Sequence, residues 1–323
     1  MTTSLFLTGG TGFVGRSLLR HLSGLGEAGK VKITVLSRSP ASFLARFPEF
    51  SSVSWLRLHQ GTVLYQETLP DSRFDTCIHA ASDTSHVSRA DLIGWFDEVV
   101  AGTRALLDWS VRYGVKRFLF LSSGAVYGPQ PAVLSAISEA VITMPDPIVA
   151  TNVYGVSKRA GEHLCALYSV QHGLEIVIAR LFSFVGYDLP LAGHLAIGNF
   201  IQDALTADAI IVAGDGTPIR TYLDQDDLAH WLMTLLEHGR PGAAYNVGSD
   251  EVISIADLAH LVRDLLAPDK PVKILGQAGD VKGRNRYIPD IRKVQRELGL
   301  AVTIPLAEAI RRTGAAHRGH TLP

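Results

Sequence analysis

The stretch TGGTGFVGRSL, residues 8–18, follows directly on the apolar run SLFL at residues 4–7. A strand, a glycine turn and a helix in this order form an anion site, because backbone N–H groups point at a pyrophosphate and the helix dipole favours negative charge. Glycines at this spacing permit a tight turn and a close approach of backbone to phosphate. We therefore expect a dinucleotide-binding turn, although an ordinary glycine-rich turn can have the same letters. The predicted cofactor contacts in it are Gly9, Gly12, Phe13, Val14 and Gly15.

Short apolar runs alternate with helical patterns through the first 180 residues. We expect strands at residues 4–8, 31–36, 53–58, 76–81, 117–123 and 174–180. These runs are apolar on both faces, as in a parallel sheet that helices cover. Between them, helical periodicity predicts helices at 12–25, 89–113 and 154–172. The alternation predicts an α/β fold with a Rossmann-type doubly wound parallel sheet.

The pattern changes after residue 180, where glycines and prolines cluster at 186–198 and 213–218. Beyond these clusters we expect helices at 225–238, 254–266 and 305–313 and a strand at 243–247. The length of 323 residues suits about two domains. We predict a dinucleotide-binding Rossmann domain at 1–180 and a smaller mixed α/β substrate lobe at 181–323, interleaved with the first.

Composition excludes several classes of function. With 47% hydrophobic and 19% charged residues the chain can bury a large core, and a net charge of −1 gives no basic field for nucleic acid or anionic membrane. The 12 histidines form no H-E-x-x-H pair, so no metal site is expected. Cys77 and Cys165 lie in apolar segments, which predicts buried reduced thiols. We see no signal peptide and no apolar run of the roughly 20 residues that a membrane span needs, and expect a cytoplasmic protein.

The end of the second predicted strand, VLSRSP at residues 35–40, indicates which dinucleotide is bound. An NAD site usually places Asp or Glu there, on the adenosine ribose. Here Ser37 occupies that position and Arg38 follows. A guanidinium can bind a 2′-phosphate, and the missing carboxylate removes the repulsion of NADP. We therefore expect NADP, with NAD as the alternative and a solvated loop arginine as the non-functional explanation.

A tyrosine and a lysine open the helix predicted at 154–172. Tyr154 and Lys158 are four residues apart and so share one helical face. The Lys158 cation and an oxidised nicotinamide would both favour the phenolate, which makes Tyr154 a usable acid or base. The fifth predicted strand ends in Ser122 and Ser123, at the edge of the sheet where ligands bind. We prefer Ser123 as the hydrogen-bond donor to the reacting oxygen.

The motifs follow one another in a characteristic order. After the glycine turn come HAAS (79–82), LSSGAVYG (121–128), YGVSK (154–158), ARLFSFVG (179–186), GDGTPIRTYLDQDDLA (214–229) and YNVGS (245–249). Together they resemble the extended short-chain dehydrogenase/reductases, the NAD(P)-dependent epimerase/dehydratase family that acts on nucleotide sugars. The resemblance implies a catalytic triad of Ser123, Tyr154 and Lys158, with Ala80 and Ala81 at the cofactor. It also implies a homodimer that pairs the helices predicted at 89–113 and 154–172.

The resemblance extends to substrate contacts. Arg220, at the end of GDGTPIR, would bind the diphosphate of a nucleotide-sugar substrate, a role that suits a bidentate guanidinium. Asn199 and Arg286 occupy positions where relatives contact the substrate. Each has a simpler alternative: a surface ion pair for Arg220, a helix cap for Asn199 and a solvated side chain for Arg286. Ser123 would also touch the substrate.

One departure from the family bears on the reaction. Sugar 4,6-dehydratases of this family carry an acidic pair after the active-site serine or threonine, whereas Gly124 and Ala125 stand there in this chain. Dehydration is therefore disfavoured, since no carboxylate is present for its proton transfers. We expect reduction of a 4-keto group of a nucleotide-activated 6-deoxy sugar by NADPH. The alternatives are an NAD-dependent C4-epimerase, a reductase of small apolar ketones, and a non-catalytic NADP-binding regulator.

Overall fold

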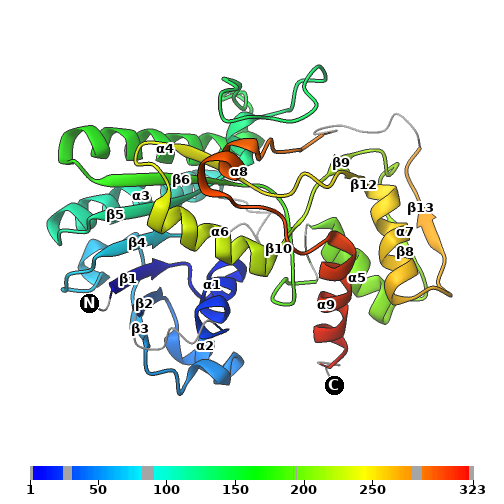
Figure 1. Ribbon diagram of the computed structural model, residues 1–323, viewed down its shortest axis with the longest axis horizontal. Coiled ribbons are helices and arrows are strands. Elements are labelled where there is room, and N and C mark those ends of the chain that lie inside the picture. Colours follow the sequence, from blue (N-terminus) through cyan, green and yellow to red (C-terminus); the bar gives the residue numbers. More distant parts are fainter. Residues whose placement is uncertain are drawn as a thin grey trace. The chain divides into compact units, whose positions relative to one another are not determined.

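In a computed structural model, the chain forms two compact units (Figure 1). The first unit contains residues 1–126, 144–180 and 229–245, and the second contains residues 127–143, 181–228 and 246–323. Within these ranges the structure describes residues 3–24, 31–81, 91–191, 193, 195–277 and 286–319.

The main sheet has seven strands. They are β1 (Thr3–Thr8), β2 (Val31–Ser37), β3 (Leu56–Gln60), β4 (Thr76–His79), β5 (Arg117–Ser123), β6 (Glu175–Leu181) and β11 (Ala244–Val247). Their order is β11-β6-β5-β4-β1-β2-β3, and the four pairs among β1 to β5 are parallel. The chain crosses from one side of β1 to the other after β3, which is the Rossmann-type reversal of strand order. The predicted doubly wound α/β fold is confirmed.

Two long helices of the first unit lie side by side in the same direction. They are α3 (Leu92–Arg112) and α4 (Val153–His172). In their first turns the indole of Trp95 stacks on the ring of Tyr154, and near their ends the hydroxyl of Tyr168 donates a hydrogen bond to Asp108. The two crossover helices that precede β5 and β6 are therefore in register along their whole length.

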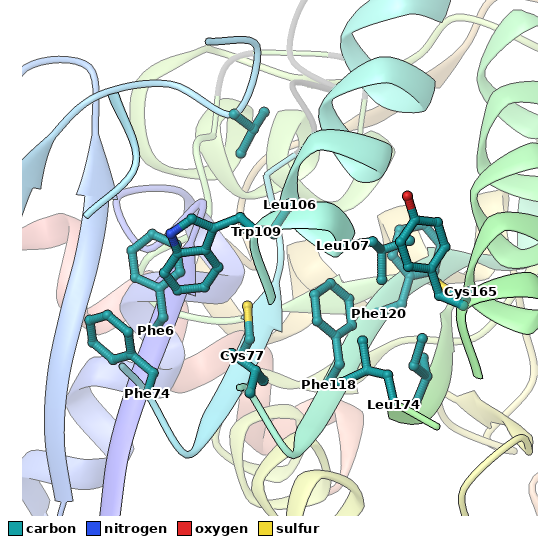
Figure 2. Packing of buried hydrophobic residues seen from close by; sticks show 14 of the residues in the cluster. Phe6, Phe74, Cys77, Leu106, Leu107, Trp109, Phe118, Phe120, Cys165 and Leu174 are labelled. Atoms are coloured by element: carbon teal, nitrogen blue, oxygen red, sulfur yellow. The ribbon is translucent and has the colours of Figure 1, made fainter. Parts of the chain in front are cut away.

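The core of the first unit lies between this helix pair and one face of the sheet. Figure 2 shows Phe6 of β1 against Trp109 of α3, with Phe118 and Phe120 of β5 further along the same cluster. Cys77 and Cys165 are free thiols in the same cluster, as predicted, and burial raises the pKa of both. These thiols are therefore packing groups and weak nucleophiles.

Side chains alternate along a strand, so the neighbours of these aromatic residues point to the opposite face. Leu5, Leu7 and Leu119 are completely or almost completely buried there. The first unit also contains α1 (Phe13–Gly24), α2 (Pro40–Arg46) and most of α6 (Gln225–His238). α1 and α6 are neighbours, with the rings of His21 and His230 5.9 Å apart.

The second unit is a mixture of helices and very short strands. Its helices are α5 (Ala196–Thr206), α7 (Ile255–Leu266), α8 (Arg292–Leu298) and α9 (Leu306–Arg318). Its strands pair as β7 (Phe184–Val185) with β10 (Leu223–Asp224), β8 (Ile210–Val212) with β13 (Val272–Ile274), and β9 (Ile219–Arg220) with β12 (Ile253–Ser254). Short 3₁₀ helices also occur among the described residues, at Pro48–Phe50, Gln66–Thr68, Gly124–Tyr127 and Ala150–Asn152. No helix among the described residues is long and apolar enough to cross a membrane.

Several predicted elements differ from the structure. The strand expected in the second lobe at 243–247 is β11, the edge strand of the main sheet, because the open edge of β6 offers its backbone a ladder. The strand expected at 53–58 begins only at Leu56. The prediction omitted α2, α5 and α8, and α5 begins inside the glycine-rich segment 186–198 that we interpreted as loop. The last helix continues to Arg318, beyond the predicted 313.

Candidate active site

The glycine turn lies between β1 and α1 at the carboxyl end of the sheet. Gly9 has φ of +71°, a left-handed conformation that side chains disfavour. A Cβ there would lie 2.5 Å from the carbonyl carbon of Ala80, just beyond β4. Gly9 therefore brings the turn against the two alanines that we predicted as cofactor contacts.

Gly15 and Gly12 have different surroundings. A Cβ on Gly15 would lie 2.3 Å from the Cα of Gly10, so this glycine lets α1 begin directly beneath the turn. A Cβ on Gly12 would meet only the carbonyl oxygen of Gly9, at 3.4 Å. Phe13 and Val14 form the first turn of α1, where N–H groups have no intrahelical acceptor. The space beside Gly12 therefore adjoins the N-terminal turn of α1.

A buried histidine holds this end of β1 in place. The Thr103 hydroxyl donates to the carbonyl of Val99, so its oxygen accepts from Nε2–H of His79 at 3.1 Å. Nδ1 of His79 then accepts from the Thr8 hydroxyl at 2.8 Å, and Thr8 in turn accepts from the N–H of Ala81. Burial, with the nearby positive charge of Lys158, lowers the pKa of His79 to about 3. The neutral imidazole is thus a fixed link between β1, β4 and α3.

The end of β2 carries the residues predicted to select the cofactor. Ser37 is buried, and its hydroxyl oxygen accepts a hydrogen bond from the N–H of Ser39. Arg38 is exposed, one residue beyond the strand. Within the described part of the chain no carboxylate binds Arg38. Its guanidinium is therefore available to an anion.

Tyr154 and Lys158 lie on the first two turns of α4. Lys158 is only 2% exposed, and its ammonium donates a 2.8 Å hydrogen bond to the carbonyl of Leu121 on β5. The ammonium nitrogen lies 6.0 Å from the centroid of the Tyr154 ring and 5.1 Å from that of Phe120. Burial is the main cause that lowers the pKa of Lys158 to about 8, and the Glu162 charge partly offsets it.

The two serines that end β5 are distinguished by their contacts. The Ser122 hydroxyl donates a 2.6 Å hydrogen bond to Glu162 of α4, whose carboxylate also receives two hydrogen bonds from Arg180 of β6. This hydroxyl is thus committed to a buried ion pair. The Ser123 hydroxyl oxygen accepts from the N–H of Ala125, and its proton is not used by that contact. These contacts agree with the choice of Ser123 as a donor.

The burial of Lys158 makes the free energy of unfolding depend on pH. Below about pH 8 Lys158 is charged in both folded and unfolded chains, and the cost of burying the charge is fully present. Between about 8 and the ordinary value of 10.5 only the unfolded chain keeps the proton, so stability due to this group rises with pH. We expect the free energy of unfolding of the wild type, relative to Lys158→Met, to rise by about 2–3 kcal/mol from pH 7 to 10.

Urea unfolding of both proteins at each pH measures this difference, since groups common to both cancel. A difference that stays constant across the range contradicts the low pKa of Lys158. A difference that falls would mean that the lysine is stabilised as a cation.

The residues that follow Ser123 carry no acid. Gly124 and Ala125 begin a 3₁₀ helix, and Ala125 is buried. Glu162, the carboxylate bound to Ser122, is itself neutralised by Arg180. The end of β5 therefore carries two serine hydroxyls and no carboxylate among residues 122–125.

The three predicted substrate contacts lie in the second unit. Both ends of the Asn199 amide bond the backbone of Gly193, at 3.3 and 3.0 Å, and the N-cap of α5 is Leu195, so the helix-cap alternative is wrong. Arg220 ends β9, and its guanidinium donates to the carbonyl of Ile219. Arg286 forms an isolated parallel bridge with Ile219, which brings the two arginines onto adjacent chain segments.

Sequence reasoning did not identify Glu162, Arg180, His79 or Trp95. A signal existed for the first two: Glu162 follows Lys158 by four residues on an otherwise apolar helix face, and Arg180 ends an apolar strand. Buried charges of opposite sign in such positions favour a pair. His79 and Trp95 carried no comparable pattern, because their partners are 71 and 59 residues distant along the chain.

The sequence and the fold both match known proteins. The family model for the NAD dependent epimerase/dehydratase family matches residues 5–248. A dTDP-glucose 4,6-dehydratase of Streptomyces griseus is 28% identical over 99% of this chain and 95% of its own length. A UDP-glucuronic acid decarboxylase of Danio rerio is 29% identical over 96% of this chain and 71% of its own length.

Solved structures confirm the fold. The crystal structure of UDP-glucuronic acid 4-epimerase from Bacillus cereus, in complex with UDP-glucuronic acid and NAD, superposes with a TM-score of 0.83 at 22% identity. The superposition covers 98% of this chain and 99% of that one.

Proposed function

This chain belongs to the NAD dependent epimerase/dehydratase family, and on that premise we propose that it reduces the 4-keto group of a nucleotide-activated 6-deoxy sugar with NADPH. The observation that carries the choice is the end of β5, where Ser123 is followed by Gly124 and Ala125. Hydride transfer at one carbon needs a proton donor and no carboxylate base. Its relatives named as dehydratases and decarboxylases also act on nucleotide sugars, which supports this substrate class.

The residues of the first unit fit a dinucleotide. The opening beside Gly12 and the donors at the start of α1 suit a pyrophosphate. Exposed Arg38, with no acidic residue at Ser37, suits a 2′-phosphate. When bound, the cofactor supplies the hydride that C4 receives. Ala80 and Ala81, held against Gly9, would border the same site.

The catalytic residues would act on the oxygen at C4. Tyr154 donates its phenol proton to that oxygen as the carbonyl becomes an alcohol, and Ser123 donates a hydrogen bond to the same atom. Lys158 lies 6.0 Å from the phenol ring and stabilises the phenolate that remains. Its contact with the Leu121 carbonyl, at 2.8 Å, orients the ammonium.

The test is turnover with a panel of nucleoside-diphosphate 4-keto-6-deoxy sugars and NADPH. We expect loss of NADPH absorbance and one alcohol product with at least one of them. No reaction with any sugar in the panel contradicts the proposal. Formation of CO₂ from a UDP-uronic acid in a parallel assay would instead assign the chain to decarboxylation.

A C4-epimerase is the second candidate. The same serine, tyrosine and lysine serve oxidation and reduction equally. A site with no carboxylate directly after Ser123 therefore also fits reversible epimerisation at C4. An epimerase keeps its cofactor, whereas a reductase exchanges it. Tightly bound NAD in the purified protein, with interconversion of UDP-hexoses in the absence of added cofactor, would favour this candidate over the reductase.

Cofactor preference gives a prediction about Arg38. Because a charge-assisted hydrogen bond is worth roughly 1.5–3 kcal/mol, Arg38→Ala should weaken NADPH binding by about 10- to 100-fold. NADH, which lacks the 2′-phosphate, should bind both proteins equally. Lys32→Ala, at the opposite end of β2, is the matched control. Calorimetric titration measures the affinity of each of the three proteins for both cofactors, and an equal loss for NADH and NADPH in Arg38→Ala would contradict the 2′-phosphate role.

We also propose contacts to the nucleotide-sugar substrate and assembly into a homodimer. Arg220 and Arg286 would contact the diphosphate, with Asn199 close to the sugar. The homodimer expected from the helices at 89–113 and 154–172 corresponds to α3 and α4, of which residues 89 and 90 lie outside the described residues. Exposed Leu167 and Val170 on α4 support it. Sedimentation of Val170→Glu beside the wild type tests whether this face joins two copies.

A further inference from the structure

Trp95 lies against the ring of the proposed proton donor. Its indole and the Tyr154 phenol are stacked, with ring centroids 5.6 Å apart and planes inclined by 18°. Both side chains are half-buried. The indole therefore lies beside the phenol in an offset stack and overlaps part of one of its faces.

Trp95 and Tyr154 lie in the first turns of α3 and α4, and local contacts fix where each helix begins. Asp91 caps α3 through a 2.7 Å hydrogen bond from the N–H of Gly94, which sets where the first turn of the helix begins. Tyr154 is in the first turn of α4, which begins directly after the 3₁₀ helix at Ala150–Asn152. A side chain on such a support has few alternative rotamers.

We propose that Trp95 is a positioning residue that holds the Tyr154 phenol in the orientation for proton transfer and excludes water from one of its faces. This inference rests on the proposed function, since it takes Tyr154 as the proton donor. The stacked area fixes the plane of the phenol and leaves the hydroxyl at its edge free to reach substrate. A proton donor loses rate steeply when it is misplaced by even about 1 Å.

Among the described residues, Lys158 carries a charge close to the phenol. On α4 it lies 6.0 Å from the ring centroid, and Glu162 is neutralised by Arg180 of β6. His79 of β4 is neutral above about pH 3. At the start of α3, Asp91 is engaged as the helix cap. Lys158 thus acts on the phenol by its charge, and Trp95 acts by shape.

Activity measurements test the positioning role. Trp95→Leu should lower kcat by about 10- to 100-fold, with the KM for NADPH unchanged, because the phenol loses its orientation and not its cofactor. Trp95→Phe keeps a flat ring and should restore kcat to within about threefold of the wild type. Phe96→Leu, an aromatic loss one residue along α3, is the matched control and should leave kcat unchanged.

Fluorescence tests the contact without substrate. An ionised phenol in face contact quenches an indole, so emission should fall as the pH rises through the Tyr154 ionisation. The part of this fall that comes from the pair should be lost in Tyr154→Phe and in Trp95→Phe. A fall in emission that remains in both variants comes from other pairs, such as Trp109 and Tyr113, whose ring centroids lie 5.5 Å apart.

The possible results distinguish a failure of the positioning role from a failure of the proposed function. If the wild type turns over substrate but Trp95→Leu keeps full kcat, or if Tyr154→Phe is quenched as strongly as the wild type, the positioning role is wrong. If the wild type is inactive on the whole panel, the proposed function fails, and the positioning role fails with it. Loss of kcat in both Trp95→Leu and Phe96→Leu would show a general effect on α3 and would also overturn the proposal.

Discussion

Tyr154→Phe is expected to lower kcat by roughly 10²–10⁴-fold, which is the usual contribution of a positioned acid or base. The substitution removes one oxygen and keeps the ring that stacks on Trp95, so the fold and the binding of NADPH should not change. Steady-state rates and calorimetric titration of NADPH measure the two effects separately.

Tyr168→Phe provides the matched control for this prediction. Tyr168 is on the same helix, and its hydroxyl bonds Asp108 of α3. It should affect stability and not kcat. Retained turnover in Tyr154→Phe would exclude Tyr154 as the proton donor. A biological role that survives the substitution would favour a non-catalytic NADP-binding regulator.

Two glycines of the same turn should respond to alanine in different ways. Gly9→Ala places a side chain at φ of +71° and a Cβ 2.5 Å from the backbone of Ala80. The left-handed conformation costs about 1–2 kcal/mol and overpacking about 1–3 kcal/mol, so we expect a loss of about 2–5 kcal/mol in the free energy of unfolding. Urea unfolding measures it.

Gly12→Ala is the matched partner of this variant. Its Cβ would meet only the Gly9 carbonyl oxygen, at 3.4 Å, so stability should change by less than about 1 kcal/mol. The methyl group would instead occupy the space proposed for the pyrophosphate and weaken NADPH binding at least tenfold. Unaltered NADPH affinity in a stable Gly12→Ala protein would place the pyrophosphate elsewhere.

Much of the fold could be predicted because its signals are local. The runs that became β1, β2 and β5 are short and apolar on both faces, and the helices at α1, α3 and α4 follow from residue spacing alone. The edge strand β11 was assigned to the wrong part of the fold, since a short strand carries no signal of its partner. Its place depends on the open edge of β6.

The candidate site also contains contacts that are local in sequence, which could be predicted, and contacts between distant residues, which could not. Tyr154 and Lys158 share a helix turn, so their proximity follows from the spacing of four residues. The pairing of Ser122 with Glu162 joins residues 40 positions apart, and only the packing of α4 on β5 shows that this hydroxyl is committed. The sequence placed both serines at the end of the strand and favoured Ser123, which remains a prediction; the contact of Ser122 is what the structure adds.

The sequence by itself determined the alternation of β1, α1, β2, α3, β5 and α4, the glycine turn, and the tyrosine–lysine pair, because each of these depends on residues within a few turns of chain. Only the tertiary structure decided which charges are neutralised and which rings touch. The Glu162–Arg180 pair, the neutral His79 and the Trp95–Tyr154 stack all join separate elements. Burial gives such contacts their effect, since removal of water makes an unpaired charge costly and fixes a stacked ring.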